Sequence, residues 1–591
     1  MKEKESKTNE SIFSYFSYYF RTKKKEIVIA VLLVILSGLI DSLGIALIVP
    51  AVDILVGFSD NANVGIISYI QTGFDFFKIP YSLRYVLGIT ALIMLIRSIL
   101  IFVQFTYVGF INANIRLELR EKFIKKINKS SWTTFKSQPQ SKLISVLTLE
   151  ANRAGTAYIN LIMFLSNLVA SLVYLTFLIF VSYKITIFAL SVAILITMGF
   201  SLLSRQSNKL GKSITKINIK YIDLLNNAFN LSKHIRVHGK DMAVTRDISK
   251  YHKLMMQNNK KNSLNDSILF STYEYAFIGF LLLGLLVSTR LLDANPSSLT
   301  LMTLIFFRLF QKTKAAQQSY QGLNKVLYSH FEFYKTLDEI KNDDKKWGSA
   351  EFNQVNKYIH FKNISFKRKS QNIFTNTSVK IKSNSTTLIV GPSGWGKTTL
   401  VDLMVGLITP DEGEILFDDI NLYNYNKDSF KKSIGYVDQN ASMFNDTIIN
   451  NLKWGNVDVS RKKIIETSKK LGMHNKIQSF TLGYNSEVGD LGSKLSGGEK
   501  QRLAIIRALI AKPKILILDE AFNQIDSNSK LPLLETIREM QANTTIIIIT
   551  HTPDTLSLAD KIIEVKNNKI KTLSKNTNWS KYFGAEGESR T

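Results

Sequence analysis

The sequence predicts a membrane-embedded α-helical bundle of six spans followed by an α/β P-loop domain that binds a nucleotide. Three observations support this prediction. Long apolar runs fill the first half of the 591-residue chain, and a glycine-rich phosphate-binding pattern follows a β-type run in the second half. The chain is also too long for a single hydrophobic core, so at least two folding units are expected.

The composition excludes several classes of protein. Apolar residues make up 45% of the chain and charged residues 21%, which is not the balance of a disordered or fibrous protein. No cysteine is present, which excludes disulfides, cysteine–zinc sites, iron–sulfur clusters and thiol catalysis. The net charge of +28 indicates either nucleic acid or a membrane surface as a partner.

Five apolar runs are long enough to cross a membrane, because about 20 helical residues span a hydrocarbon core of ~30 Å. A sixth run is short and continues into a polar helical pattern. We expect it to be the sixth span, because both chain ends are expected in the cytoplasm and the number of spans must then be even. One face of this span is expected to line a wet cavity, which would explain its polar residues. The runs cover residues 27–56, 85–111, 160–183, 185–203, 268–291 and 299–310, with Lys184 at the expected turn between the third and fourth.

The basic residues set the orientation of these spans. Residues 112–160 and 205–266 are rich in lysine and arginine, and the positive-inside rule places both loops and the N-terminus in the cytoplasm. The aromatic run 12–20 with its basic flank predicts an interfacial helix that leads into the first span. The positive charge is therefore explained by the membrane, and nucleic acid is not expected as a partner.

A phosphate-binding loop begins the chemistry of the second half. The pattern GxxxxGK[ST] lies between a β-type run, 388–390, and an apolar helical pattern, 400–407, which is the context that it requires. Glycines let backbone N–H groups close on phosphate oxygens, and the helix N-terminus attracts the anion. Lys397 is expected to reach the β- and γ-phosphates of ATP, and Thr398 to ligate Mg²⁺. The predicted binding residues of the loop are Gly391, Ser393, Gly394, Gly396, Lys397, Thr398 and Thr399.

Two further β-type runs end in residues that suit phosphate chemistry. The run 515–518 ends in Asp519 and Glu520. We expect Asp519 in the Mg²⁺ shell, and Glu520 to polarise a water in line with the γ-phosphate. The run 545–550 ends in His551, which is expected to contact the γ-phosphate.

The sequence LSGGE at 495–499 lies between the P-loop and the Asp-Glu strand. With these motifs together, essentially the whole chain resembles an ABC transporter. The resemblance implies that Glu520 is the catalytic glutamate, that His551 is the switch histidine and that Gln439 is the Q-loop glutamine, which also ligates Mg²⁺. It further implies nucleotide contacts from the signature motif and the D-loop, at Ser496, Gly497, Gly498 and Asp526.

The order of the parts resembles that of an exporter half-transporter, and residues 486–490 resemble the exporter-specific loop that precedes the signature. The family places its coupling helices near 135–141 and 238–244. The expected domains are an interfacial elbow at 1–26, a transmembrane domain with two long cytoplasmic loops at 27–335, a linker at 336–350, a nucleotide-binding domain at 351–580 and a flexible tail at 581–591.

Two positions depart from the family pattern. The D-loop reads Asn523-Gln524-Ile525-Asp526 where the family usually has SALD. The position of the adenine-stacking aromatic holds Arg368, whose guanidinium is also able to stack on a base.

The resemblance also implies a second copy of the chain. The family places ATP between the P-loop of one copy and the signature of the other, and one chain supplies one of each. Because the key residues of both motifs are intact, a homodimer with two competent sites is expected in the cytoplasmic membrane.

Charged residues inside the apolar runs are the candidates for substrate contact. Asp41 and Arg97 both fall near mid-membrane, so they are expected either to form a structural ion pair or to touch the substrate. Arg308 has no obvious acidic partner in the sixth span and is expected either to face an anionic headgroup such as a diphosphate or to anchor the cytoplasmic end of its helix.

The first span carries Asp41, then Gly44-Ile45 and Pro50, which resembles the branch that flips lipid-linked oligosaccharides. An amphipathic, lipid-linked substrate is therefore expected. A peptide or toxin exporter is the alternative, although the absence of cysteine disfavours leader-cleaving exporters. An ATP-gated membrane protein that transports nothing is a third class, and the intact catalytic residues argue against it.

Overall fold

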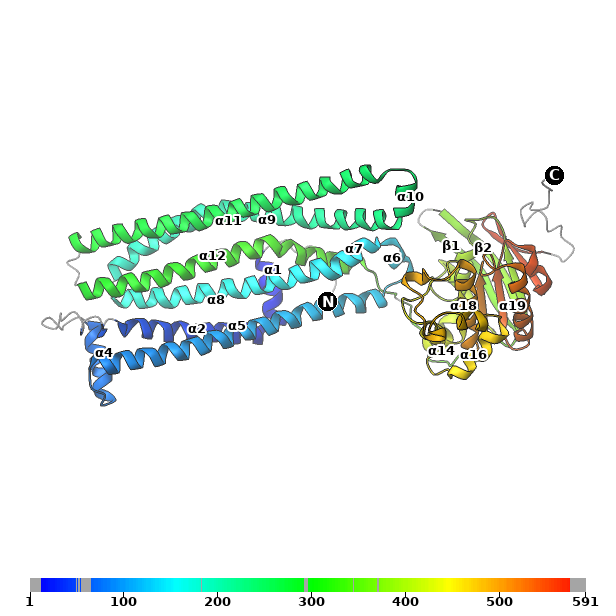
Figure 1. Cartoon of the computed structure of the whole chain (residues 1–591), viewed down its shortest axis with the longest axis horizontal. Coiled ribbons are helices and arrows are strands. Elements are labelled where there is room, and N and C mark those ends of the chain that lie inside the picture. Colours follow the sequence, from blue (N-terminus) through cyan, green and yellow to red (C-terminus); the bar gives the residue numbers. More distant parts are fainter. Residues whose placement is uncertain are drawn as a thin grey trace. The chain divides into compact units, whose positions relative to one another are not determined.

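The computed structural model describes residues 12–48, 50–51, 54, 65–181, 183–291, 296–343, 345–368 and 371–573. The chain divides into two compact units, drawn in Figure 1. The first contains Met1–Ser130 and Thr134–Asn342, and the second contains Ser131–Thr133 and Asp343–Thr591. The predicted tail at 581–591, the final residues of the predicted nucleotide-binding domain and most of the end of the first apolar run lie outside the described residues.

Long helices make up the first unit. Their bounds are α2 Lys24–Ala46, α5 Leu83–Asn128, α8 Ala151–Val181, α9 Tyr183–Asn230, α11 Asp241–Leu291 and α12 Pro296–Glu339. Among the described residues, the helical segments Lys24–Ala46, Leu83–Asn128 and Gln140–Thr176 are long and apolar enough to cross a membrane. The helices α5, α9, α11 and α12 have 46, 48, 51 and 44 residues, more than twice the ~20 needed to span a bilayer. In these four helices, the apolar run therefore covers only part of the helix.

Lys184 was expected at the connection between two spans, but it lies in the first helical turn of α9. A lysine at the end of a long helix does not need to break it, because its flexible stem can carry the charge to the membrane surface.

Short helices connect the long ones. Ile12–Thr22 forms α1, Gly65–Phe76 forms α4 and Gln140–Ser145 forms α7, followed by a π-helical turn at Val146–Glu150. The helices at the expected coupling positions are α6, Trp132–Ser137, and α10, Ser232–Val237, both slightly earlier than predicted. The chain leaves α10 through Gly239, whose φ of 59° favours glycine.

Helix α1 is fixed to α8 and α12 by aromatic side chains. Tyr15 and Tyr19 are buried, at 1% and 3% exposure. The ring of Tyr15 lies 4.6 Å from His330 of α12, and the ring of Tyr19 lies 4.8 Å from Tyr158 of α8. Buried aromatic pairs add stability beyond their apolar area, so the predicted interfacial helix packs against the bundle through this face.

The second unit contains two sheets. The first has six strands in the order β10-β9-β3-β8-β7-β6, and the second is antiparallel with the order β2-β1-β4-β5. In the first sheet, β3, β6, β7, β8 and β9 are parallel, and β10 is antiparallel. The strands are β1 Tyr358–Arg368, β2 Gln371–Lys382, β3 Thr386–Val390, β4 Glu412–Phe417, β5 Ile420–Asn421, β6 Ile434–Val437, β7 Ile515–Asp519, β8 Thr545–Ile549, β9 Lys561–Lys566 and β10 Lys569–Leu573.

Every residue of β3, β7 and β8 is buried, as the continuous apolar runs of central parallel strands require. Their carboxyl ends meet at one edge of the sheet, which is where ligands bind in parallel α/β folds. This edge collects the predicted nucleotide-site residues.

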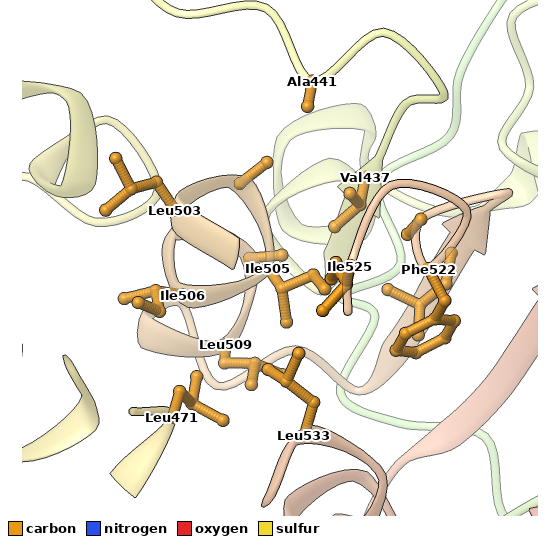
Figure 2. Close-up of a cluster of buried hydrophobic side chains, with 14 of the residues drawn as sticks. Val437, Ala441, Leu471, Leu503, Ile505, Ile506, Leu509, Phe522, Ile525 and Leu533 are labelled. Atoms are coloured by element: carbon orange, nitrogen blue, oxygen red, sulfur yellow. The ribbon is translucent and has the colours of Figure 1, made fainter. Parts of the chain in front are cut away.

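Helices flank the six-stranded sheet. They are α13 Lys397–Met404, α14 Lys427–Lys432, α15 Ile448–Lys453, α16 Arg461–Lys470, α17 His474–Gln478, α18 Gly497–Ile510 and α19 Ser527–Met540. Helix α18 contributes Leu503, Ile505, Ile506 and Leu509 to the hydrophobic cluster drawn in Figure 2. Phe522 and Ile525, from the loop after β7, belong to the same cluster, so this loop is fixed by packing.

Candidate functional site

The phosphate-binding loop joins β3 to α13, and its glycines have positive φ: 143° at Gly391, 81° at Gly394 and 105° at Gly396. A Cβ at Gly391 would lie 2.3 Å from the carbonyl oxygen of Val565, and one at Gly396 would lie 2.6 Å from Cγ2 of Ile373. Both positions therefore require glycine.

Lys397 closes over this loop. Its Nζ donates to the carbonyl oxygens of Gly391, at 2.7 Å, and Pro392, at 3.1 Å. Burial lowers the pKa of the Lys397 ammonium, although the nearby Glu520 and Asp519 oppose this shift. The lysine ammonium is thus held within the loop by two of the loop's own carbonyl oxygens.

Asp519 and Thr398 meet at the end of β7. The Thr398 hydroxyl lies 3.4 Å from Oδ2 of Asp519. Burial, followed by the carboxylates of Glu520 and Asp438, raises the pKa of the Asp519 carboxyl to about 6. A buried carboxylate that lacks a cation and lies beside a hydroxyl offers the oxygen ligands that Mg²⁺ prefers.

Glu520 is the centre of a hydrogen-bonded group. Its Oε2 accepts from the side-chain amides of Gln439, at 2.7 Å, and Asn523, at 3.0 Å. Its Oε1 lies 3.3 Å from Nε2 of His551. Burial and the nearby Lys397 cation lower the pKa of His551, while Glu520 opposes the shift. The structure therefore brings Gln439, Glu520 and His551 together, as the sequence predicted, and adds Asn523, which the sequence analysis did not select.

The backbone at Glu520 has a φ of 51°, which is uncommon for a residue with a side chain. Its N–H donates to the carbonyl oxygen of Ile549, at 2.9 Å, so the turn is tied to β8. Such strain persists only where surrounding contacts enforce it, and it is typical of functional positions.

The LSGGE motif starts α18. The Ser496 hydroxyl accepts from the N–H of Glu499, and the Glu499 carboxylate accepts from the N–H of Ser496 at 2.8 Å, which is a capping box. Gly497 and Gly498 leave no room for a Cβ, because one would lie 2.0 Å from Oε1 of Gln524 and the other 2.7 Å from its carbonyl oxygen. The signature is therefore held against the D-loop of its own chain.

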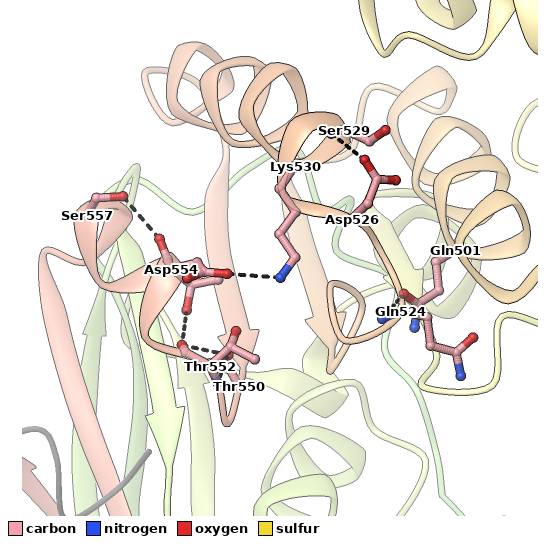
Figure 3. Close-up of polar contacts among 10 residues, drawn as sticks. Gln501, Gln524, Asp526, Ser529, Lys530, Thr550, Thr552, Asp554 and Ser557 are labelled. Carbon is pink, nitrogen blue, oxygen red and sulfur yellow. Dashed lines mark hydrogen bonds and ion pairs between the residues drawn. The ribbon is translucent and has the colours of Figure 1, made fainter. Parts of the chain in front are cut away.

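Asp526 and Arg368 lie outside this hydrogen-bonded group. Asp526 caps α19 by accepting from the N–H of Ser529, at 3.0 Å (Figure 3). Arg368 is the exposed last residue of β1 and pairs across the strands with Gln371. Residues 369 and 370, which follow it, lie outside the described part of the chain, and its predicted adenine contact stays a prediction.

A second charged group lies in the membrane unit. Asp41 of α2 is 1% exposed, and its Oδ1 lies 2.6 Å from Nε of Arg97 on α5. Its Oδ2 accepts from the Tyr174 hydroxyl and lies 3.9 Å from Nε of Arg308. Arg308 was expected to have no acidic partner in its own span, and the carboxylate that faces it comes from another helix, α2. The two residues are 267 positions apart in sequence (308 − 41), and helix packing brings them together.

Comparisons with known proteins agree with both units. Residues 27–313 match the family described as ABC transporter transmembrane region, and residues 374–523 match the family described as ABC transporter. The chain is 25% identical to the heterocyst differentiation ATP-binding protein HepA of Nostoc sp., over 77% of this chain and 76% of that protein. It is 26% identical to the ATP-dependent lipid A-core flippase of Syntrophus aciditrophicus, over 81% of this chain and 80% of the flippase.

The fold is similar to that of a solved bacterial Atm1-family ABC exporter with ATP bound. The TM-score is 0.76 at 20% sequence identity, over 93% of this chain and 94% of that one. The predicted fold class, a helical membrane domain fused to an α/β nucleotide-binding domain, is confirmed. The chain therefore belongs to the ABC transporter family, as an exporter half-transporter that binds ATP and couples its hydrolysis to transport.

Proposed function

We propose that the edge formed by the ends of β3, β7 and β8 is the site of ATP hydrolysis, with Glu520 as the catalytic carboxylate. The single observation that supports this most is the convergence of Gln439 and His551 on Glu520, next to the P-loop lysine. Glu520 accepts a hydrogen bond from Gln439 and lies 3.3 Å from Nε2 of His551, so an incoming water would take the place of one of these neighbours and give its proton to the carboxylate.

The P-loop residues would bind the phosphates. Lys397 would leave the carbonyl oxygens of its loop for the β- and γ-phosphates, and the N–H groups of Gly394, Gly396 and Thr399 would donate to phosphate oxygens, with Ser393 beside them. His551 would leave Glu520 and donate to the γ-phosphate. In the proposed pair of chains, Ser496, Gly497, Gly498 and Asp526 of the second copy would complete the site, and Arg368 would stack on the adenine.

Asp519, Thr398 and Gln439 fit Mg²⁺, because they offer a buried carboxylate, a hydroxyl 3.4 Å away and an amide carbonyl at the end of a neighbouring strand. A bound Mg²⁺ would neutralise charge on the β- and γ-phosphates. Gln439 faces Glu520 with its amide nitrogen, so its carbonyl oxygen is the atom that would ligate the cation.

We propose a homodimer of this chain in the cytoplasmic membrane, with the nucleotide-binding unit and the N-terminus in the cytoplasm. One chain carries a single P-loop and a single signature, both intact. Two identical copies arranged head to tail would therefore give two complete sites.

For the substrate, we propose an amphipathic lipid with an anionic headgroup, such as a lipid-linked oligosaccharide. The support is the charge around Asp41: one carboxylate is faced by Arg97 and Arg308, and Lys312, one turn after Arg308, lies within electrostatic range of all three. Among the described residues at this place, the cations outnumber the single carboxylate, and charge inside a membrane bundle is costly without a partner. An anionic headgroup would supply that partner.

Within this group, Asp41 and Arg97 serve as the structural ion pair and Arg308 makes the substrate contact. The Arg97 and Asp41 side chains are 20% and 2% exposed and lie 2.6 Å apart, whereas the Arg308 side chain is 36% exposed and 3.9 Å from the carboxylate. A guanidinium that is both more exposed and more loosely paired is the one that is able to bind a phosphate.

The test is an ATPase and flipping assay in proteoliposomes that compares a lipid-diphosphate glycan with amphipathic peptides. We expect stimulation of hydrolysis and flipping by the lipid alone. Arg308→Ala should lose most of this stimulation with its basal ATPase intact, while Arg246→Ala, at an exposed position on α11, should behave as wild type. Stimulation by peptides alone would support the peptide exporter, and no stimulation by either would reject the proposed substrate.

The catalytic role of Glu520 has its own test. Glu520→Gln should bind ATP but lose nearly all hydrolysis, because an amide does not take the proton of the water. Wild-type turnover in this variant would reject the role.

A further inference from the structure

The D-loop of this chain makes two contacts that the proposed reaction has not used. It follows Glu520 directly and reads Asn523-Gln524-Ile525-Asp526. Its first residue touches Glu520, and its second touches the signature motif. These are also the positions where the sequence departs from the usual SALD.

The contact of Asn523 differs in kind from the other two contacts of Glu520. Gln439 and His551 approach Glu520 from the loops that follow β6 and β8, and each has a second proposed partner, the cation for Gln439 and the γ-phosphate for His551. Asn523 lies three residues after Glu520 in the same loop, and its Nδ2 donates to Oε2 at 3.0 Å. Its backbone N–H also donates to the Glu520 carbonyl oxygen at 3.3 Å. This amide is thus the neighbour of Glu520 that has no second proposed partner in the reaction.

The loop that carries Asn523 is held rigidly. Phe522 and Ile525, on either side, are 2% and 4% exposed in the core. The N–H of Gln524 donates to Oε1 of Gln501, which is 1% exposed on α18, at 3.0 Å (Figure 3). Because the loop is fixed on both sides of Asn523, little conformational entropy is lost when the Asn523 side chain binds Glu520. A positioning residue requires this property.

The loop also connects two parts of the site. The Gln524 side chain and carbonyl oxygen lie over Gly497 and Gly498, at the start of α18. The orientation of Glu520 is therefore tied, through one short loop, to the signature motif of the same chain.

From these contacts we propose that Asn523 is a positioning residue for Glu520: its amide holds the carboxylate in the orientation that accepts the proton of water, and Gln524 seats this loop on the signature. This inference rests on the proposed catalytic role of Glu520.

The test measures kcat and KM for ATP with the full-length chain in proteoliposomes. Asn523→Ala should lower kcat about 10-fold, with KM changed less than about 2-fold, since the amide acts on the carboxylate and not on ATP binding. Asn523→Asp has the same shape but lacks the donor at neutral pH, so it should lose at least as much. Asn475→Ala, an exposed asparagine on α17, is the matched control and should keep the wild-type kcat.

A double-mutant cycle tests whether Asn523 acts through Glu520. Glu520→Asp keeps a carboxylate, but its side chain is one methylene shorter. The carboxylate therefore lies farther from the Asn523 amide. In that background, Asn523→Ala should lower kcat by less than about 2-fold. An equal loss in both backgrounds, an unchanged kcat in both Asn523 variants, or a rise in KM alone would overturn the inference. Thermal melting of each variant shows that it is folded, and the Asp variant, which preserves shape, gives a second measurement if the Ala variant melts early.

The two proposals fail differently. If Glu520→Gln hydrolyses ATP at the wild-type rate, the catalytic role of Glu520 is rejected, whatever the Asn523 variants do. If Glu520→Gln is inactive and both Asn523 variants are fully active, only the positioning role is rejected.

Discussion

Replacing Asp41 by leucine is the sharpest test of the buried charge group in the membrane unit. The substitution removes the one carboxylate that Arg97 approaches at 2.6 Å and Arg308 at 3.9 Å, and it removes the acceptor of the Tyr174 hydroxyl. Breaking a buried ion pair from one side costs about 3–5 kcal/mol, because the remaining charge is left without a partner. At about 2–4 °C per kcal/mol for a unit larger than 150 residues, the melting temperature should fall by roughly 6–20 °C.

The assay is thermal unfolding of the purified full-length chain in detergent, followed through the membrane unit. Arg97→Met should be milder than Asp41→Leu, because Arg308 still faces the carboxylate. The double variant Asp41→Leu/Arg97→Met should recover most of the loss, since replacing both charges by apolar groups is often close to neutral. Asp75→Asn, at an exposed position on α4, is the control and should not shift the transition.

Two results would refute this reasoning. A melting temperature of Asp41→Leu within about 2 °C of wild type would mean that the carboxylate does not stabilise the bundle. A double variant as unstable as Asp41→Leu alone would mean that the loss comes from packing or from Arg308 and Tyr174, which also lose their partner, and not from the unpaired Arg97. Lipid-stimulated flipping that survives in the stable double variant would further assign the pair to structure and leave Arg308 as the substrate contact.

Three further outcomes concern the nucleotide-binding unit. Phe522→Ala should destabilise it by about 3–5 kcal/mol, because the ring is 2% exposed in the core, and a loss below about 1 kcal/mol in chemical denaturation would contradict that packing. Gly498→Ala should lower the melting temperature more than Gly497→Ala, because its Cβ would meet the Gln524 backbone and not a movable side-chain end; the reverse order would contradict this. Burial, then Lys345 and Lys427, lowers the pKa of Lys431 to about 8 from an ordinary value near 10.5. The folded chain therefore binds fewer protons between pH 8 and 10.5, so its stability should rise with pH over that range relative to Lys431→Met, and parallel profiles would contradict the shift.

The nucleotide site was largely predictable because its parts are short, contiguous patterns. The P-loop must carry glycine where φ is positive, and the Asp-Glu and His551 positions follow buried strands whose carboxyl ends meet at one edge. Asn523 was missed for the opposite reason. Its departure from SALD was visible, but the bond that it makes depends on the side-chain orientation of Glu520, which no pattern specifies.

The apolar runs predicted long membrane-type helices in the first unit, but not how far these helices extend. Outside the apolar runs, the long helices carry many polar and charged residues, so a search for continuous apolar runs did not find these parts. The turn predicted at Lys184 was wrong for a related reason, since a charge at the end of a run resembles a loop in sequence even where it lies in a helix.

The sequence by itself determined the class of the protein and its two kinds of unit, and it predicted the residues of the phosphate site, because these follow from short local patterns. Only the tertiary structure decided which charges meet. Asp41, Arg97, Tyr174 and Arg308 come from four helices, and the rotation of each helix about its own axis sets which side chains face each other. That rotation follows from packing over the whole bundle and is not encoded in any one segment.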